Sequence, residues 1–186
     1  MLTGGTSAGV TADRQPSAIF RQLQNVPFRS SELPPHFRLL LRSSPPYPGR
    51  PTAWRPAHPV AWRAGGAELA FALEGPDRID LVGYTVYQTP RQARAALSAG
   101  PKSHRFGFAP STSRLVGRVR GFSISTLWRA RDDGMLFVEA EVLSGFVEVR
   151  SLTVVASRSG QGDIAANVAM IRVGLRHLHR VETKTP

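Results

Sequence analysis

The side chains of this chain that could do chemistry are carboxylates, histidines and hydroxyls, because the sequence contains no cysteine. That absence excludes disulfides, thiolate nucleophiles and cysteine-ligated zinc or iron–sulfur sites. Glu139 and Glu141 alternate with apolar residues and would lie about 7 Å apart on one face of a strand. This spacing suits a pair of carboxylates in acid–base catalysis. An exposed sheet face explains the same pattern, and it is the interpretation we expect to hold.

The other candidates for chemistry are weaker. His177 and His179 are two residues apart, so on a helix their rings point roughly 200° apart and cannot share a metal ion. We expect a solvated helix end there. Segment 157–162 has two glycines between an apolar strand and a helix, but it lacks the lysine of a phosphate-binding loop and the third glycine of a dinucleotide fingerprint. We therefore expect no enzyme, no metal and no cofactor, although spacing alone leaves a serine–histidine hydrolase open.

Binding residues are suggested by an unusual stretch in which Ala-Trp-Arg occurs twice, at 53–55 and at 61–63. Tryptophan beside arginine in a proline-rich frame can stack on bases, lie at a lipid interface or belong to a polyproline-type ligand. The alternative is that both rings fold back over the sheet and bury their large apolar area. The candidate residues are Trp54, Arg55, Trp62 and Arg63.

A second group of candidates follows from the charge of the chain. The formal net charge is +11, and the basic residues are scattered and almost all arginine. Near the C-terminus Arg172, Arg176 and Arg180 are spaced four apart and form a row on one side of the expected helix, where cations complement the helix dipole. An arginine-rich surface of a soluble protein is the simpler interpretation, whereas polyanion binding requires clustered charge.

The length of 186 residues predicts one domain with enough surface to bury a core. No apolar run reaches 18 residues, so no membrane-spanning segment is expected. The composition divides the chain into a flexible segment over 1–15, a domain over 16–182 and a frayed tail over 183–186. Within the domain, 43–66 is rich in proline, tryptophan and arginine and is expected to form a long loop.

Hydrophobic periodicity predicts the elements that position these residues. A hairpin over 67–87 leads to a helix that starts at Pro90 after the N-cap Thr89 and ends at Gly100. A second hairpin, over 135–157, leads to a helix with one apolar stripe. Other expected elements are a helix from Pro16, a strand over 37–42, a loop over 101–117 and strands over 119–124 and 126–131. The stripe of the last helix contains Ile164, Val168, Ile171, Leu175 and Leu178.

Two strand–strand–helix units, over 67–100 and 135–180, therefore dominate the chain. This order favours the α+β class, with an antiparallel sheet of about five to seven strands, helices packed on the sheet and an amphipathic helix at the C-terminus.

The same order of elements resembles exported domains of high-GC Gram-positive bacteria. The segments that carry the resemblance are ELPPHF before a strand, a GPD turn, the TPRQARAAL helix, the strand LTVVAS and the closing IRVGLRHL helix. The chain is similar to the extracytoplasmic sensor domain of PknH-type kinases and to PsbP-like lipoproteins of the LpqN type, over about residues 16–182. The resemblance implies an antiparallel α+β sandwich outside the membrane and transfers no catalytic residue. Sensor domains of this group usually carry disulfides, which this chain lacks.

We therefore expect a non-enzymatic, exported or surface-tethered domain, sensor-like or lipoprotein-like, that binds an unidentified protein or small ligand. The alternative is a binder of polyanions, either nucleic acid or anionic lipid. Its binding residues would be the two Trp-Arg pairs, together with Arg172, Arg176 and Arg180.

Overall fold

The computed structural model of the protein describes residues 16–43, 67–75, 78–97, 112–132, 135–156 and 162–183. Segments 1–15, 44–66 and 184–186 lie outside the described residues, and with them Trp54, Arg55, Trp62 and Arg63. The elements in chain order are α1 (Pro16–Asn25), the 3-10 turn η1 (Ser30–Glu32), β1 (Arg38–Ser43), β2 (Ala67–Glu74), β3 (Ile79–Val86), α3 (Pro90–Leu97), β4 (Thr112–Gly117), β5 (Ser125–Asp132), β6 (Met135–Ser144), β7 (Val147–Ala156) and α4 (Gly162–Glu182).

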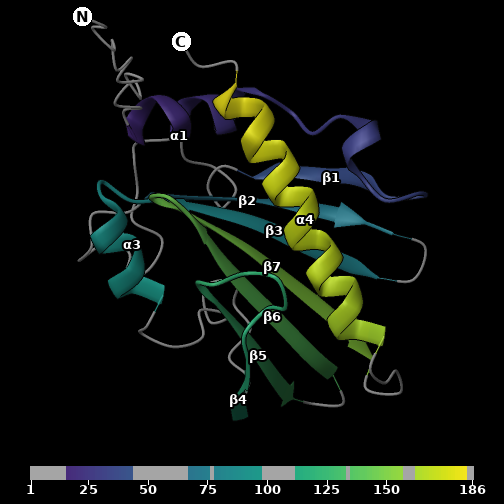
Figure 1. Ribbon diagram of the computed structural model, residues 1–186. Coiled ribbons are helices and arrows are strands. Elements are labelled where there is room, and N and C mark those ends of the chain that lie inside the picture. The colour runs from purple at the N-terminus through teal and green to yellow at the C-terminus, as the bar shows by residue number, and fades with distance from the viewer. Residues whose placement is uncertain are drawn as a thin grey trace, which may run out of the picture.

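The strands form a seven-stranded sheet in the order β1-β2-β3-β7-β6-β5-β4 (Figure 1). Every neighbouring pair is antiparallel, which confirms the expected α+β class. The two expected hairpins are β2–β3 and β6–β7, and they join through the pairing of β3 with β7. β7 is thus the central strand, as the continuous apolar run in its second half predicts.

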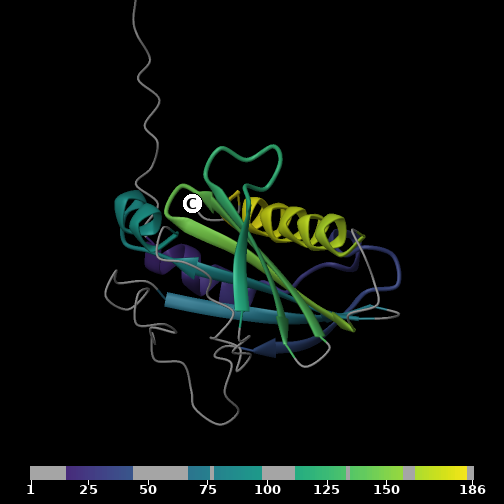
Figure 2. The same cartoon turned by 90° about the horizontal axis from the view of Figure 1, so that it is seen from below.

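The core lies between one face of the sheet and the helices α4 and α1. Residues of β2 and β3 such as Phe71 and Tyr84 and residues of β6 and β7 such as Val138 and Val149 belong to one buried cluster. The apolar stripe of α4 packs on this cluster, and Ile19 and Leu23 of α1 complete it. Figures 1 and 2 show α4 crossing one side of the sheet, with α1 near its C-terminal end.

Two contacts set how α4 lies on the sheet. The Asn167 amide donates hydrogen bonds to the Val138 carbonyl at 2.8 Å and to Thr153 Oγ1 at 3.0 Å. Gly174 then faces the β3–β7 pair, where a Cβ atom would lie 2.6 Å from Val149 Cγ1. Glycine is required at this position because the helix backbone approaches the sheet too closely for a side chain.

The helix α3 packs at the end of the sheet. Its Ala93 and Ala96 form a small cluster with Tyr87 and with the partly buried Leu143. The N–H of Gln92 donates to Thr89 Oγ1 at 3.2 Å, which confirms Thr89 as the N-cap.

The region between α3 and β5 differs from expectation. Strand β4 lies inside the expected loop over 101–117, and the expected strand over 119–124 is a turn. In that turn Phe122 N–H donates to the Val119 carbonyl at 3.1 Å, and Gly121 has a φ of 90°. Val119 and Phe122 both pack on the core from this turn, so the apolar residues of this segment are buried without forming a strand.

The close approach at Gly174 predicts the effect of a single methyl group. Helix propensity alone favours alanine over glycine by about 1 kcal/mol. Because the methyl would press on Val149, we expect Gly174→Ala instead to lower the free energy of unfolding by about 1–3 kcal/mol, as measured by urea denaturation.

The double variant Gly174→Ala/Val149→Ala provides the control. Removing the Val149 methyls makes room for the added methyl, so the two effects should be less than additive by about 1 kcal/mol. A stabilising Gly174→Ala would contradict the close contact.

Candidate functional site

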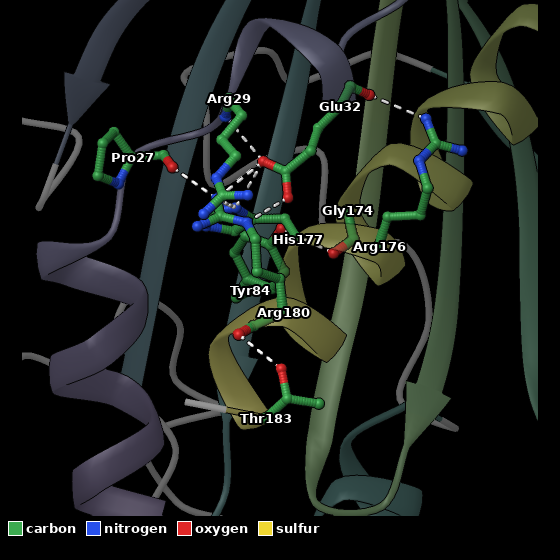
Figure 3. A network of polar contacts seen from close by, with 9 residues as sticks. All are labelled: Pro27, Arg29, Glu32, Tyr84, Gly174, Arg176, His177, Arg180 and Thr183. Atoms are coloured by element: carbon green, nitrogen blue, oxygen red, sulfur yellow. Dashed lines mark hydrogen bonds and ion pairs between the residues drawn. The ribbon is translucent and has the colours of Figure 1, made fainter. Parts of the chain in front are cut away.

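A partly buried ionic contact joins the segment after α1 to the C-terminal turns of α4 (Figure 3). Arg180 Nε donates to Glu32 Oε1 at 2.6 Å, and Arg180 Nη2 donates to Glu32 Oε2 at 2.8 Å. The same Nη2 also donates to the Pro27 carbonyl at 2.7 Å, and the Arg29 N–H donates to Glu32 Oε2 at 2.8 Å. We call Glu32, His177 and Arg180 the Glu32 clasp, because together they hold η1 against α4.

His177 is a core residue. Its side chain is 0% exposed, and its ring stacks on Phe28 with centroids 4.0 Å apart. His177 Nδ1 lies 3.3 Å from Glu32 Oε2 and 3.0 Å from Arg180 Nη2. The expected solvated helix end is therefore wrong for His177, although His179 is exposed. The error arose because the residues that cover His177 lie about 145 positions earlier in the chain.

The electrostatics of the clasp follow from its hydrogen bonds. Burial raises the pKa of the Glu32 carboxyl, but hydrogen bonds from Arg180, the Arg29 N–H and His177 outweigh burial and bring the pKa to about 2. The bond to Glu32 raises the pKa of Arg180 in turn. The carboxylate and the guanidinium are both ionised at neutral pH.

The three arginines expected to form a row on α4 are not equally available, because two of them form hydrogen bonds with Glu32. Arg172 and Arg176 are exposed, and Arg176 Nη2 donates to the Glu32 carbonyl at 2.9 Å. Arg180 is only partly exposed because it is occupied by Glu32. The structure does not leave three guanidinium groups side by side on the surface, so the binding role of this row remains a prediction.

The face of the sheet opposite α4 carries buried charges. Glu139 is 2% exposed and Glu141 is 0% exposed, so the expected exposed face is wrong at this position. Arg150 of β7 is also buried, and its Nε lies 3.9 Å from Glu139 Oε1. Strand alternation correctly placed both glutamates opposite the core residues of β6, but alternation does not reveal whether that second face is covered.

Two of the buried carboxylates accept hydrogen bonds from hydroxyl groups. Thr126 Oγ1 donates to Glu141 Oε2 at 2.8 Å, and Tyr87 Oη donates to Glu148 Oε2 at 2.8 Å. Gly83 leaves room for the Arg150 side chain, since a Cβ there would lie 3.1 Å from Arg150 Nη2. Burial lowers the pKa of Arg150 to about 9, which still leaves it charged at neutral pH.

A pocket of about 670 Å³ opens between the end of α3 and the connection from β4 to β5. One part of its wall is apolar, formed by Leu97, Leu115 and Ile124. The polar part contains two arginines, one from the helix and one from the connection. The full lining is Arg94, Leu97, Leu115, Gly117, Arg118, Ser123, Ile124, Ser125 and Thr126.

The charged residues in the lining of this pocket are both arginines. Arg94 and Arg118 line it, and Arg91 and Arg120, which are exposed, lie on the same two segments. The sequence contains the signal for this site: residues 81–131 include nine lysines and arginines and no aspartate or glutamate. The seven of these residues that the structure describes are spread over α3, β4, β5 and the β4–β5 connection, so a search for runs of basic residues misses them.

We also searched the part of the chain that the structure describes for metal sites and membrane-spanning helices. There, no group of three or more histidines, aspartates and glutamates could hold a metal ion. None of the helices described is both long and apolar enough to cross a membrane.

Comparisons with known proteins show no family. The sequence matches no protein-family model, and no curated protein is significantly similar to it. Among solved structures, the chain is similar to the extracellular domain of PknH from Mycobacterium tuberculosis, with a TM-score of 0.42 and 13% sequence identity over 68% of this chain and 70% of that one. A similarity of this size carries no argument about function. The resemblance to LpqN-type lipoproteins stays a prediction.

The Glu32 clasp predicts a specific dependence of stability on pH. The pKa of Glu32 is lowered from 4.5 to about 2 on folding, so ionised Glu32 contributes its full stability above pH 4.5. That contribution, about 3 kcal/mol, should disappear as the pH falls from about 4.5 to about 2. We expect Glu32→Gln to remove this component when unfolding is measured by urea titration across pH 2–7.

Glu74→Gln is the matched control. Glu74 forms an ion pair with Arg38, whose side chain is mostly exposed, and exposed pairs contribute only about 0–1 kcal/mol. The Glu74 variant should retain the acid-dependent loss of stability, and an equal effect of both substitutions would contradict the role of the clasp.

Proposed function

We propose that this protein is a non-enzymatic binding domain that takes a small amphipathic anion in the pocket between α3 and the β4–β5 connection. The observation that carries the proposal is the combination, in one lining, of an apolar wall with two arginines and no acidic residue.

The chemistry of the lining fits this class of ligand. Guanidinium groups bind carboxylate, phosphate or sulfonate groups through paired hydrogen bonds, and Arg94 of α3 and Arg118 of the β4–β5 connection supply such groups to the lining. Leu97, Leu115 and Ile124 suit an alkyl or aromatic tail. The volume of about 670 Å³ lies within the range of small-molecule pockets, about 300–1,000 Å³.

The burial and hydrogen bonds of His177 and Glu141 support binding better than catalysis. His177 is fully buried in the core and contacts Glu32, away from the lining of the pocket. Glu141 is also fully buried and accepts a hydrogen bond from Thr126. These groups are in place to stabilise the fold.

Two further proposals concern the location of the protein and the binding of polyanions. An exported or surface-tethered location is tested by fractionation of cells with an antibody to the native protein, and a purely cytosolic pool would reject it. Polyanion binding through α4 is less well supported than the pocket, because Arg180 forms a bidentate contact with Glu32.

The pocket predicts preferential binding of anionic amphiphiles. Anilinonaphthalene sulfonate should fluoresce in the presence of the folded protein, and decanoate should displace it about tenfold more effectively than decanol, because a charged hydrogen bond contributes about 1.5–3 kcal/mol. We expect Arg94→Gln and Arg118→Gln each to weaken decanoate binding by a similar factor.

Arg91→Gln and Arg120→Gln are the matched controls, because these arginines are exposed on the same segments but do not line the pocket. They should change the affinity less than about twofold if direct contact rather than net charge decides binding. Equal displacement by decanoate and decanol, or equal losses in all four variants, would reject the proposed site. Circular dichroism confirms that each variant is folded.

A further inference from the structure

The outer edge of β4 has the features of a surface that accepts another strand. β4 is the last strand in the order of the sheet, and among the described strands it pairs only with β5 (Figure 1). An edge strand directs half of its backbone N–H and C=O groups away from the sheet, where they can pair with another chain. We propose that β4 binds an extended, acidic segment of a partner protein as an additional strand.

The side chains of β4 support this inference. Leu115 is 51% exposed and Val116 is 47% exposed, and they are the large apolar side chains that stand out as exposed among the described residues. The register of β4 against β5 shifts between Leu115 and Gly117, so Val116 lies at an irregularity of the pairing, and both exposed side chains offer apolar contact to an added strand. Recognition of this kind combines backbone hydrogen bonds with side-chain contacts.

The charge near β4 determines which strand can bind. Arg118 and Arg120 are exposed just after β4, and no acidic residue occurs between positions 81 and 131. A second copy of this chain would present an equally basic edge, with no acidic residue between positions 81 and 131 to pair with these arginines, and like charges brought together are unfavourable. An acidic segment would instead be complementary. The edge therefore favours an acidic partner over self-association.

This proposal is independent of the small-molecule pocket, although the two are adjacent. Leu115 and Arg118 line the pocket and also lie where an added strand would bind, but that strand would in addition use the backbone edge of β4 and Val116, which is not in the pocket lining. Binding of decanoate without binding of a strand would reject only the present inference. Binding of a strand without binding of decanoate would reject only the pocket.

The first experiment uses two hexapeptides as probes, one of alternating glutamate and valine and one of alternating lysine and valine. Amide hydrogen exchange of the full chain is measured with and without each peptide. At saturating glutamate peptide we expect the exposed amides of β4 to exchange at least about tenfold more slowly, because new backbone hydrogen bonds protect them. The lysine peptide should give no protection. Protection at the other edge strand, β1, without protection at β4 would overturn the proposal.

The second experiment tests backbone pairing directly. Two versions of the glutamate peptide are methylated on alternate backbone nitrogens, so that in each version the methyl groups lie along one edge. Only the edge that faces β4 needs its N–H groups, so one version should lose binding and the other should retain it. Equal binding of both versions would show side-chain contact alone and would overturn strand addition.

The variant Leu115→Thr/Val116→Thr tests the apolar contact while it keeps residues that favour strands. We expect about tenfold weaker binding of the glutamate peptide, measured by calorimetry. Arg91→Gln on α3 is the charge control and should bind the peptide with nearly unchanged affinity. Unchanged peptide affinity in the Leu115/Val116 variant would contradict the proposal.

Discussion

The close contact between α4 and the centre of the sheet is the constraint on which the structure depends. The two hairpin units meet where β3 pairs with β7, and Gly174 lies against Val82 of one strand and Val149 of the other. Tyr84 of β3 donates to the Gly174 carbonyl at 2.9 Å, so the contact is polar as well as apolar. Because α4 is held there, its last turns reach the segment after α1, and the Glu32 clasp can form.

Acidic side chains are buried more often than basic side chains in this protein. Among the described residues, five carboxylates are buried (Glu32, Asp80, Glu139, Glu141 and Glu148), whereas Arg150 is the buried cation. Each of these groups has a polar contact within the fold, as in the bond of Thr153 to Asp80. A ligand or partner therefore meets a surface with fewer acidic groups than the composition implies. The lining of the pocket between α3 and the β4–β5 connection contains two arginines and no acidic residue, although basic residues are scattered in the sequence.

The limits of prediction from the sequence can be seen at particular residues. The alternation of apolar residues correctly predicted that Leu69, Phe71 and Leu73 are buried in the core. It succeeded because both strands of that hairpin are close in sequence and share one covered face. The same reasoning failed for Glu139 and Glu141, since it assumed that the second face is open. It also failed for β4, whose short sequence has no alternation, and for His177, whose partners lie at the other end of the domain.

The sequence by itself determined the helices and hairpins, the antiparallel α+β class and the excess of positive charge, because these follow from periodicity, turn residues and composition. Only the tertiary structure decided which polar residues are buried, which arginines are occupied and which meet at the pocket. The physical reason is that burial and charge pairing depend on residues distant in the chain, such as Glu32 and Arg180 or Arg94 and Arg118, and local sequence patterns do not specify which distant segments come together.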